Sequence, residues 1–137
     1  MPKAAYIVRF ALAAMALAMN PLPSLAASFP ICKGGHRVTC VVDGDTFWLN
    51  GEKVRVDGYD SPEMGQPKCS GPAPGAVEAR SALARLLNTG IVELDRRGTD
   101  RYGRTLARVL VDGQDITKEM IGAGHGRRYK PGQQDWC

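Results

Sequence analysis

The sequence predicts a small α+β domain, mainly of β-structure, in which five short strands form a barrel and two short helices accompany them. Three observations lead to this expectation. Five segments have the composition of strands, and two have apolar residues at helical spacing. The chain has 137 residues, which is room for one domain. Five short strands suit a closed Greek-key barrel better than a sandwich or a parallel sheet.

Residues 1–26 are expected to be a signal peptide that is not part of this domain. The basic residues Lys3 and Arg9 come before an apolar run at residues 10–19, and a segment with small residues follows at 24–26. This order is typical of secretory signal peptides, and the run is too short to cross a bilayer, which needs roughly 20 residues. We therefore expect residues 27–137 to form the domain, exported to the periplasm or the medium without a membrane anchor.

The first three strands are expected at residues 37–42, 46–49 and 52–56. The first segment is rich in β-branched side chains. Asn50 and Gly51 separate the other two and fit the two positive φ angles of a type I′ turn, which predicts a hairpin.

A two-residue turn also fixes the register of this hairpin. Leu49 then faces Glu52, and Thr46 faces Arg55. Because side chains alternate along a strand, the core face is expected to carry Phe47, Leu49, Val54 and Val56.

A helix is expected over residues 76–87, where apolar residues recur at helical spacing before Asn88 and Gly90. Two further strands are expected at residues 91–94 and 105–111.

A second, shorter helix is expected to begin after an Asp115 cap and to end near Gly122. The tail from Gly124 onward is basic and aromatic. The simplest barrel with this order of elements is the five-stranded OB-fold.

The net charge does not identify a partner. Without Lys3 and Arg9, 16 basic residues face 14 acidic ones, a net charge of +2. Binding of a polyanion depends on clustered charge rather than on this total. Clusters do exist, at Arg96, Arg97, Arg101 and Arg104, and at Arg127, Arg128 and Lys130.

Four cysteines follow the signal segment: Cys32, Cys40, Cys69 and Cys137. In an exported domain an even number favours two disulfides, with three possible pairings. The alternative is a zinc site at Cys32, His36 and Cys40, which lacks a fourth nearby ligand and the usual short spacing.

Acidic residues in two short segments have the chemistry of a metal-assisted hydrolase. Asp45 and Asp60 lie near predicted strand ends and offer hard carboxylate oxygens. With a backbone carbonyl and waters, they suit Ca²⁺, which takes six to eight oxygens. Glu63 follows three residues after Asp60 and is a candidate for accepting a proton from water.

Arg55 and Arg104 complete this set because a planar guanidinium pairs well with phosphate oxygens. A phosphodiester transition state gathers negative charge, which a cation and two arginines stabilise. The alternative interpretation is that Arg55 pairs with a carboxylate and only closes the mouth of the barrel.

These motifs together resemble the staphylococcal nuclease family, from about Arg37 to Pro131. The resemblance rests on the Asp-Gly-Asp-Thr segment at 43–46, the Arg55 to Glu63 segment with its Asp-Ser-Pro-Glu, and Asp-Arg-Tyr-Gly-Arg at 100–104. It implies Ca²⁺-dependent hydrolysis of single-stranded DNA and RNA that leaves 3′-phosphate ends.

The resemblance also implies a role for each matching residue. Calcium ligands would be the Asp45 and Asp60 carboxylates and the backbone carbonyl of Ser61. Glu63 would be the general base. The remaining roles are phosphate binding by Arg55 and Arg104, nucleotide contact by Tyr102, Tyr129 and Lys130, and support near the metal by Asp43 and Thr46.

The sequence departs from the family pattern at its C-terminal end. Arg127 or Arg128 replaces the first of two paired tyrosines, and the family's long C-terminal helix is missing. A disulfide to Cys137, with Cys69 as one candidate partner, is expected to anchor the tail instead.

A monomer is expected. The alternative function is an OB-fold module that binds single-stranded nucleic acid without cutting it. Such modules have usually lost the acids or the arginines, and this chain keeps all five.

Overall fold

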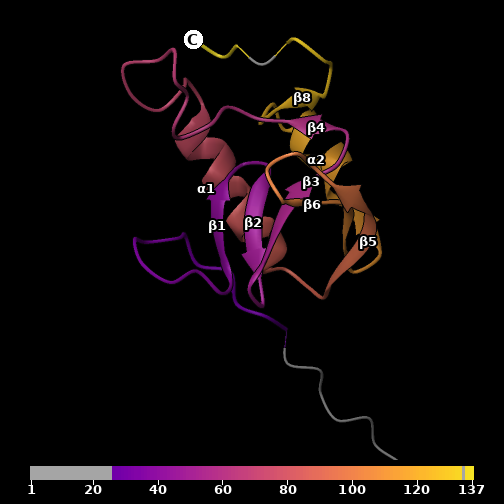
Figure 1. Ribbon diagram of the computed structural model, residues 1–137. Coiled ribbons are helices and arrows are strands. Elements are labelled where there is room, and N and C mark those ends of the chain that lie inside the picture. Colours follow the sequence, from indigo (N-terminus) through magenta and orange to yellow (C-terminus); the bar gives the residue numbers. More distant parts are fainter. Residues whose placement is uncertain (1–25, 134) are drawn as a thin grey trace, which may run out of the picture.

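The computed structural model describes residues 26–133 and 135–137, so almost all of the expected signal segment lies outside the described residues. The described chain is a mixed α+β fold (Figure 1). Its elements, in chain order, are β1 (Cys40–Asp43), β2 (Thr46–Leu49), β3 (Glu52–Val56), β4 (Tyr59–Asp60), α1 (Ala76–Leu87), β5 (Val92–Thr99), β6 (Thr105–Val111), β7 (Gln114–Asp115), α2 (Ile116–Gly122) and β8 (Arg127–Arg128).

The main sheet has the strand order β1-β2-β3-β6-β5, with β7 paired to β6. β3 and β6 run parallel, and the other pairs are antiparallel. Within the described residues no ladder joins β1 to β5, so the sheet is not recorded as a closed barrel. β4 and β8 form a separate two-stranded ribbon, which Figure 1 shows near one end of the main sheet.

The predicted hairpin is confirmed. Asn50 and Gly51 have φ angles of 51° and 84°, as a type I′ turn requires. Leu49 pairs with Glu52 and Thr46 pairs with Arg55, which is the expected register. This register sends Arg55 to the face opposite the core residues and so toward the site described below.

Both predicted helices are confirmed. α1 spans Ala76–Leu87, and Asn88 is its C-cap residue. α2 begins after Asp115, whose side chain accepts a hydrogen bond from the Thr117 backbone N–H. None of the described helices is long and apolar enough to cross a membrane.

Two predicted strands have different bounds in the structure, Cys40–Asp43 instead of 37–42 and Val92–Thr99 instead of 91–94. β1 begins at Cys40 rather than residue 37, because residues 37–39 make no ladder and Val38 is 47% exposed. β5 extends to Thr99 rather than ending at Leu94. The second half of β5 is charged and exposed. It adopts a strand conformation because it pairs with β6, and the register of this pairing shifts between Arg96 and Gly98.

The core lies between the sheet and the helices. α1 packs against β1 and also contacts α2. Asn88 connects the chain before β1 to this core, because its side chain accepts from Phe29 N at 2.9 Å and donates to Phe29 O at 3.0 Å. The largest fully buried apolar side chains are Tyr59, Phe29, Phe47, Leu83, Leu87, Ile116 and Met120.

Two disulfides connect the four cysteines. Cys32 bonds to Cys40, and Cys69 bonds to Cys137. The zinc alternative is therefore wrong, because both of its cysteines are in a disulfide. The expected anchoring of the C-terminus through Cys137 is found, and Cys69 is the partner. Two disulfides indicate a chain that folds in an oxidising compartment.

The ribbon of β4 and β8 requires a glycine at residue 126. A Cβ atom there would overlap the Tyr59 ring and the Asp60 carbonyl oxygen. The Tyr59 hydroxyl also donates to the His125 carbonyl at 2.9 Å, and this hydrogen bond holds the backbone beside Gly126 close to the Tyr59 ring. The absence of a side chain at Gly126 therefore lets the end of the chain lie against Asp60.

We predict that Gly126→Ala lowers the free energy of unfolding by about 1–3 kcal/mol, because the overlapping atoms belong to a buried ring and to backbone. Gly122→Ala is the matched control, since a Cβ at Gly122 would have nothing within 4 Å. Its effect should be at most about 1 kcal/mol, and it should stabilise the helix. Urea denaturation measures both, and equal destabilisation by the two variants would contradict the prediction.

Candidate active site

Asp45 is the most deeply buried acid of the predicted site. It lies in the turn between β1 and β2 and is 0% exposed. The Thr46 hydroxyl donates to its Oδ1 at 2.9 Å, and the Ser61 backbone N–H donates to its Oδ2 at 3.0 Å. Asp60, the last residue of β4, is also buried. The bond from Ser61 therefore connects the turn after β1 to the end of β4, so that both carboxylates are held together.

Arg55 in β3 lies between these two carboxylates. Its Nη2 atom is 3.6 Å from Asp45 Oδ2 and 3.5 Å from Asp60 Oδ1. Its Nη1 atom donates at 2.8 Å to the carbonyl oxygens of Val56 and Tyr59. The pairing with carboxylates that the alternative interpretation foresaw is thus present. However, both Nη2 distances are longer than the 2.7–2.9 Å typical of charged hydrogen bonds, so this nitrogen is loosely held.

Asp43 and Glu63 add two more carboxyl groups near Asp45. Asp43 ends β1, and Glu63 lies half-buried in the loop after β4. Burial raises the pKa of Asp43, Asp60 and Glu63, and the negative charge of Asp45 raises each pKa further. The charge of Arg104 lowers the pKa of Glu63 in part. The four acids are therefore one electrostatically coupled cluster.

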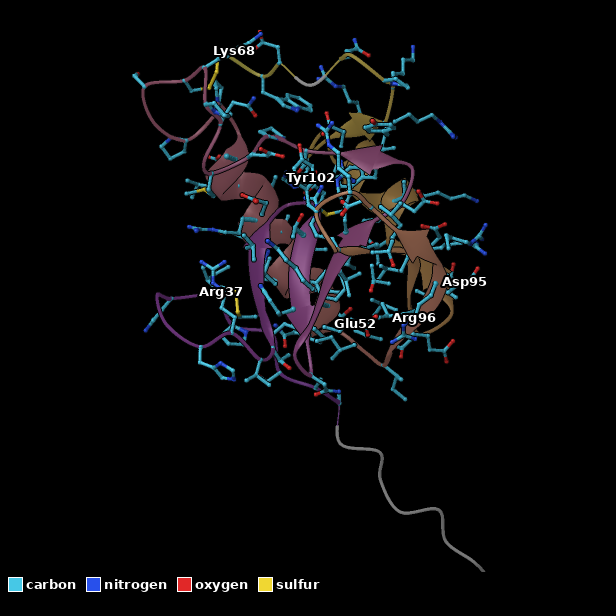
Figure 2. All side chains as sticks on the ribbon, viewed as in Figure 1. Arg37, Glu52, Lys68, Asp95, Arg96 and Tyr102 are labelled. Atoms are coloured by element: carbon cyan, nitrogen blue, oxygen red, sulfur yellow. A yellow bond between two sulfur atoms is a disulfide. The ribbon has the colours of Figure 1, made fainter. Side chains whose placement is uncertain are left out.

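The loop between β5 and β6 positions Arg104 and Tyr102. Asp100 Oδ1 accepts the backbone N–H of both residues at 2.9 Å, and its Oδ2 accepts Arg104 Nε at 2.7 Å. The hydrogen bond of this ion pair is made through Nε. Tyr102 is 68% exposed, with the Arg101 and Arg104 guanidinium groups 4.8 and 5.4 Å from its ring centroid. In Figure 2, Tyr102 lies well apart from the exposed ion pair of Glu52 and Arg96, which is near the turn between β2 and β3.

Tyr129 and Lys130 follow β8 at the surface. The Tyr129 backbone N–H donates to the Gly58 carbonyl at 3.0 Å, and its ring centroid is 5.7 Å from the Arg55 guanidinium. Tyr129 is therefore adjacent to the acid cluster. Among the described residues, no hydrogen bond or ion pair of the cluster involves the exposed Lys130 side chain.

Two residues that sequence reasoning did not place in the site contact Asp60. Arg127 Nη2 is 3.4 Å from Asp60 Oδ2, and Trp136 Nε1 donates to the same oxygen at 3.0 Å. These contacts span 67 and 76 residues of sequence. The sequence signals were the basic cluster that contains Arg127 and the position of Trp136 beside Cys137, but neither signal pointed to Asp60.

The donor set fits a hard cation. No three His, Cys, Asp or Glu residues of the described chain form a metal-binding group, so a cation would depend on two carboxylates with backbone and water oxygens. Such oxygens are the ligands that Ca²⁺ takes. Within residues 26–133 and 135–137, the buried Ser61 hydroxyl there has no hydrogen-bond partner. A Cβ at Gly44 would lie 2.7 Å from that hydroxyl, so only glycine allows this close packing.

Comparison with known proteins places these residues in a family. The family described as staphylococcal nuclease homologue matches residues 53–135, which is more than half of the chain. An uncharacterized endonuclease of Haemophilus influenzae is 35% identical over 108 residues, covering 75% of this chain and 57% of that protein. A thermonuclease of Staphylococcus intermedius is 32% identical over 97 residues, covering 67% and 58%.

Endonuclease YncB of Bacillus subtilis is 37% identical over 95 residues, covering 63% of this chain and 44% of that protein. The chain thus spans little more than half the length of these relatives, or less. The match nevertheless includes the carboxylates Asp60 and Glu63, the arginines Arg55 and Arg104, and the tail residue Arg127. This chain belongs to the staphylococcal nuclease family.

Proposed function

We propose that this chain is a nuclease that hydrolyses phosphodiester bonds of single-stranded DNA and RNA, requires Ca²⁺ and leaves 3′-phosphate ends. The observation that carries the proposal is the Arg55 guanidinium, loosely held between the buried carboxylates of Asp45 and Asp60. Family membership and the nuclease names of its relatives also support it.

The calcium ligands in this proposal are the carboxylates of Asp45 and Asp60 and the backbone carbonyl of Ser61. The coupled acids support it, because a cluster with raised pKa values is relieved by a nearby cation. Asp43 and Thr46 support the ligands, Thr46 through its hydrogen bond to Asp45. Bound calcium would stabilise negative charge on the phosphate as a Lewis acid.

Glu63 accepts a proton from the attacking water in this mechanism. The water oxygen bonds to phosphorus as the bond from phosphorus to the 5′-oxygen breaks, and the leaving 5′-oxygen takes up a proton from solvent. The burial that raises the pKa of Glu63 makes its carboxylate a better base. Arg55 and Arg104 donate hydrogen bonds to the phosphate oxygens, where charge develops. Because arginine stays protonated, we assign it charge stabilisation and no proton transfer.

Nucleotide binding is assigned to Tyr102, Tyr129 and Lys130, which are exposed beside the cluster or in the tail. Exposed aromatic rings stack on bases, each contact contributing about 1–3 kcal/mol. Bases are open to such stacking in a single strand, which supports the proposed preference. A lysine adds attraction to the phosphate backbone.

We also propose that residues 1–26 direct export and that residues 27–137 act as a monomeric domain. The disulfides support export, because they form in oxidising compartments.

Digestion of denatured DNA and of RNA tests the calcium requirement. The disulfide-bonded protein should cleave both with millimolar Ca²⁺ and neither with a calcium chelator, and the products should carry 3′-phosphates. Gel retardation without cleavage in calcium would contradict the proposal and favour the non-catalytic binding module. Cleavage that persists in chelator would contradict the calcium assignment alone.

Glu63→Gln should lower kcat by about 10²–10⁴-fold, the usual contribution of a general base. The amide is nearly the same size, so the affinity for a single-stranded oligonucleotide should stay close to that of the wild type. Glu78→Gln on the exposed first turn of α1 is the matched control and should leave kcat unchanged. Steady-state kinetics and fluorescence anisotropy measure the two quantities. Turnover near wild type in Glu63→Gln would refute the general-base role.

A further inference from the structure

The end of the chain lies against one oxygen of Asp60. Arg127 pairs with Asp60 in the β4–β8 ribbon, and its Nη2 is 3.4 Å from Asp60 Oδ2. The Trp136 indole N–H donates to the same oxygen at 3.0 Å. The Arg127 guanidinium is also 3.9 Å from the centroid of the Trp136 ring. Two donors that stack on each other therefore converge on Oδ2.

The other oxygen of Asp60 faces the rest of the site. Asp60 Oδ1 is 3.5 Å from Arg55 Nη2, and that nitrogen is 3.6 Å from Asp45 Oδ2. Oδ1 is therefore the oxygen on the side of Asp45. A carboxylate whose second oxygen accepts fixed hydrogen bonds cannot rotate freely, and this is how outer contacts orient metal ligands.

A disulfide holds these donors in place. Cys137, the neighbour of Trp136, is bonded to Cys69 in the loop before α1. The nearby Lys68–Asp135 ion pair measures 3.2 Å, but its side chains are 72% and 55% exposed. Exposed pairs of this kind stabilise little. Figure 1 shows the C-terminal trace leading from β8 back toward this loop, near the N-terminal end of α1. The covalent bond is therefore the stronger tie.

We propose that Trp136 and Arg127 are positioning residues for Asp60, and that the Cys69–Cys137 disulfide keeps them there. The affinity of the site for calcium then depends on the tied C-terminus. This inference rests on the proposed function, in which Asp60 is a calcium ligand. It assigns to residues 135–137, held by the disulfide, a part in metal binding.

Isothermal titration of Ca²⁺ into the disulfide-bonded full chain tests this inference. Trp136→Phe keeps an aromatic ring beside Arg127 but removes the N–H donor. It should weaken calcium binding by about 10-fold or more, as loss of outer contacts does at metal sites. Because the ligands themselves remain, kcat at saturating calcium should recover to near the wild-type value. A purely structural role of Trp136 would not give this separation.

The double variant Cys69→Ser/Cys137→Ser tests the disulfide and should weaken calcium binding in the same way. Its matched control is Cys32→Ser/Cys40→Ser, which removes the other disulfide and should leave calcium affinity unchanged. Trp48→Phe controls for loss of an indole elsewhere, and urea denaturation of each variant verifies that it is folded under the titration conditions.

Calcium affinity equal to or tighter than wild type in Trp136→Phe would overturn the inference and leave the proposed function standing. Equal weakening in the two cysteine variants would overturn the role of the Cys69–Cys137 bond. Failure of the wild-type chain to bind calcium would instead overturn the calcium assignment itself, and this inference with it.

Discussion

The site depends on the burial of one guanidinium group. Arg55 is 8% exposed and makes hydrogen bonds to two carbonyl oxygens while its second amino group faces Asp45 and Asp60. Removing charges from water costs several kcal/mol for each ion, and among the described residues Arg55 is the cation that faces both carboxylates. The bonds from Nη1 also hold the chain between β3 and β4, which places Asp60. Arg55 therefore offsets part of the negative charge and also helps to set the geometry.

Close packing around Arg55 depends on glycine residues at two places where segments of the chain lie in tight contact. Gly44 lies where a Cβ would be 2.6 Å from Ala79 Cβ, which brings α1 against the turn that carries Asp45. Gly126 has the same function at the ribbon of β4 and β8. Asp43 and Asp60 lie on strands and Asp45 lies in a tightly packed turn, while Glu63 lies in the loop after β4. Functional groups supported in this way keep their geometry when substrate binds.

Local signals predicted the parts of the fold that local chemistry determines. The Asn50-Gly51 turn determines the hairpin register, and the Asp115 cap determines the start of α2. The second half of β5 has no such signal, because its charged residues become a strand only by pairing with β6. The contact of Trp136 with Asp60 was also beyond prediction. This contact spans 76 residues and exists because a disulfide brings the tail back to the site. The spacing of the cysteines in the sequence does not show which of them pair.

The same acids that suit the site reduce the stability of the fold without a cation. Burial and mutual repulsion raise the pKa of Asp60 and Glu63. A carboxyl group with a raised folded-state pKa stabilises the fold below its unfolded pKa, and this stability is lost as the pH rises through the folded pKa. Once the pH exceeds their folded pKa values, these carboxyl groups are therefore destabilising. The Cys69–Cys137 bond, which joins residues 68 apart, contributes about 4 kcal/mol on the chain-entropy model. The disulfide that ties the tail to Asp60 thus also offsets the cost of burying that carboxylate, so stability and site geometry depend on the same bond.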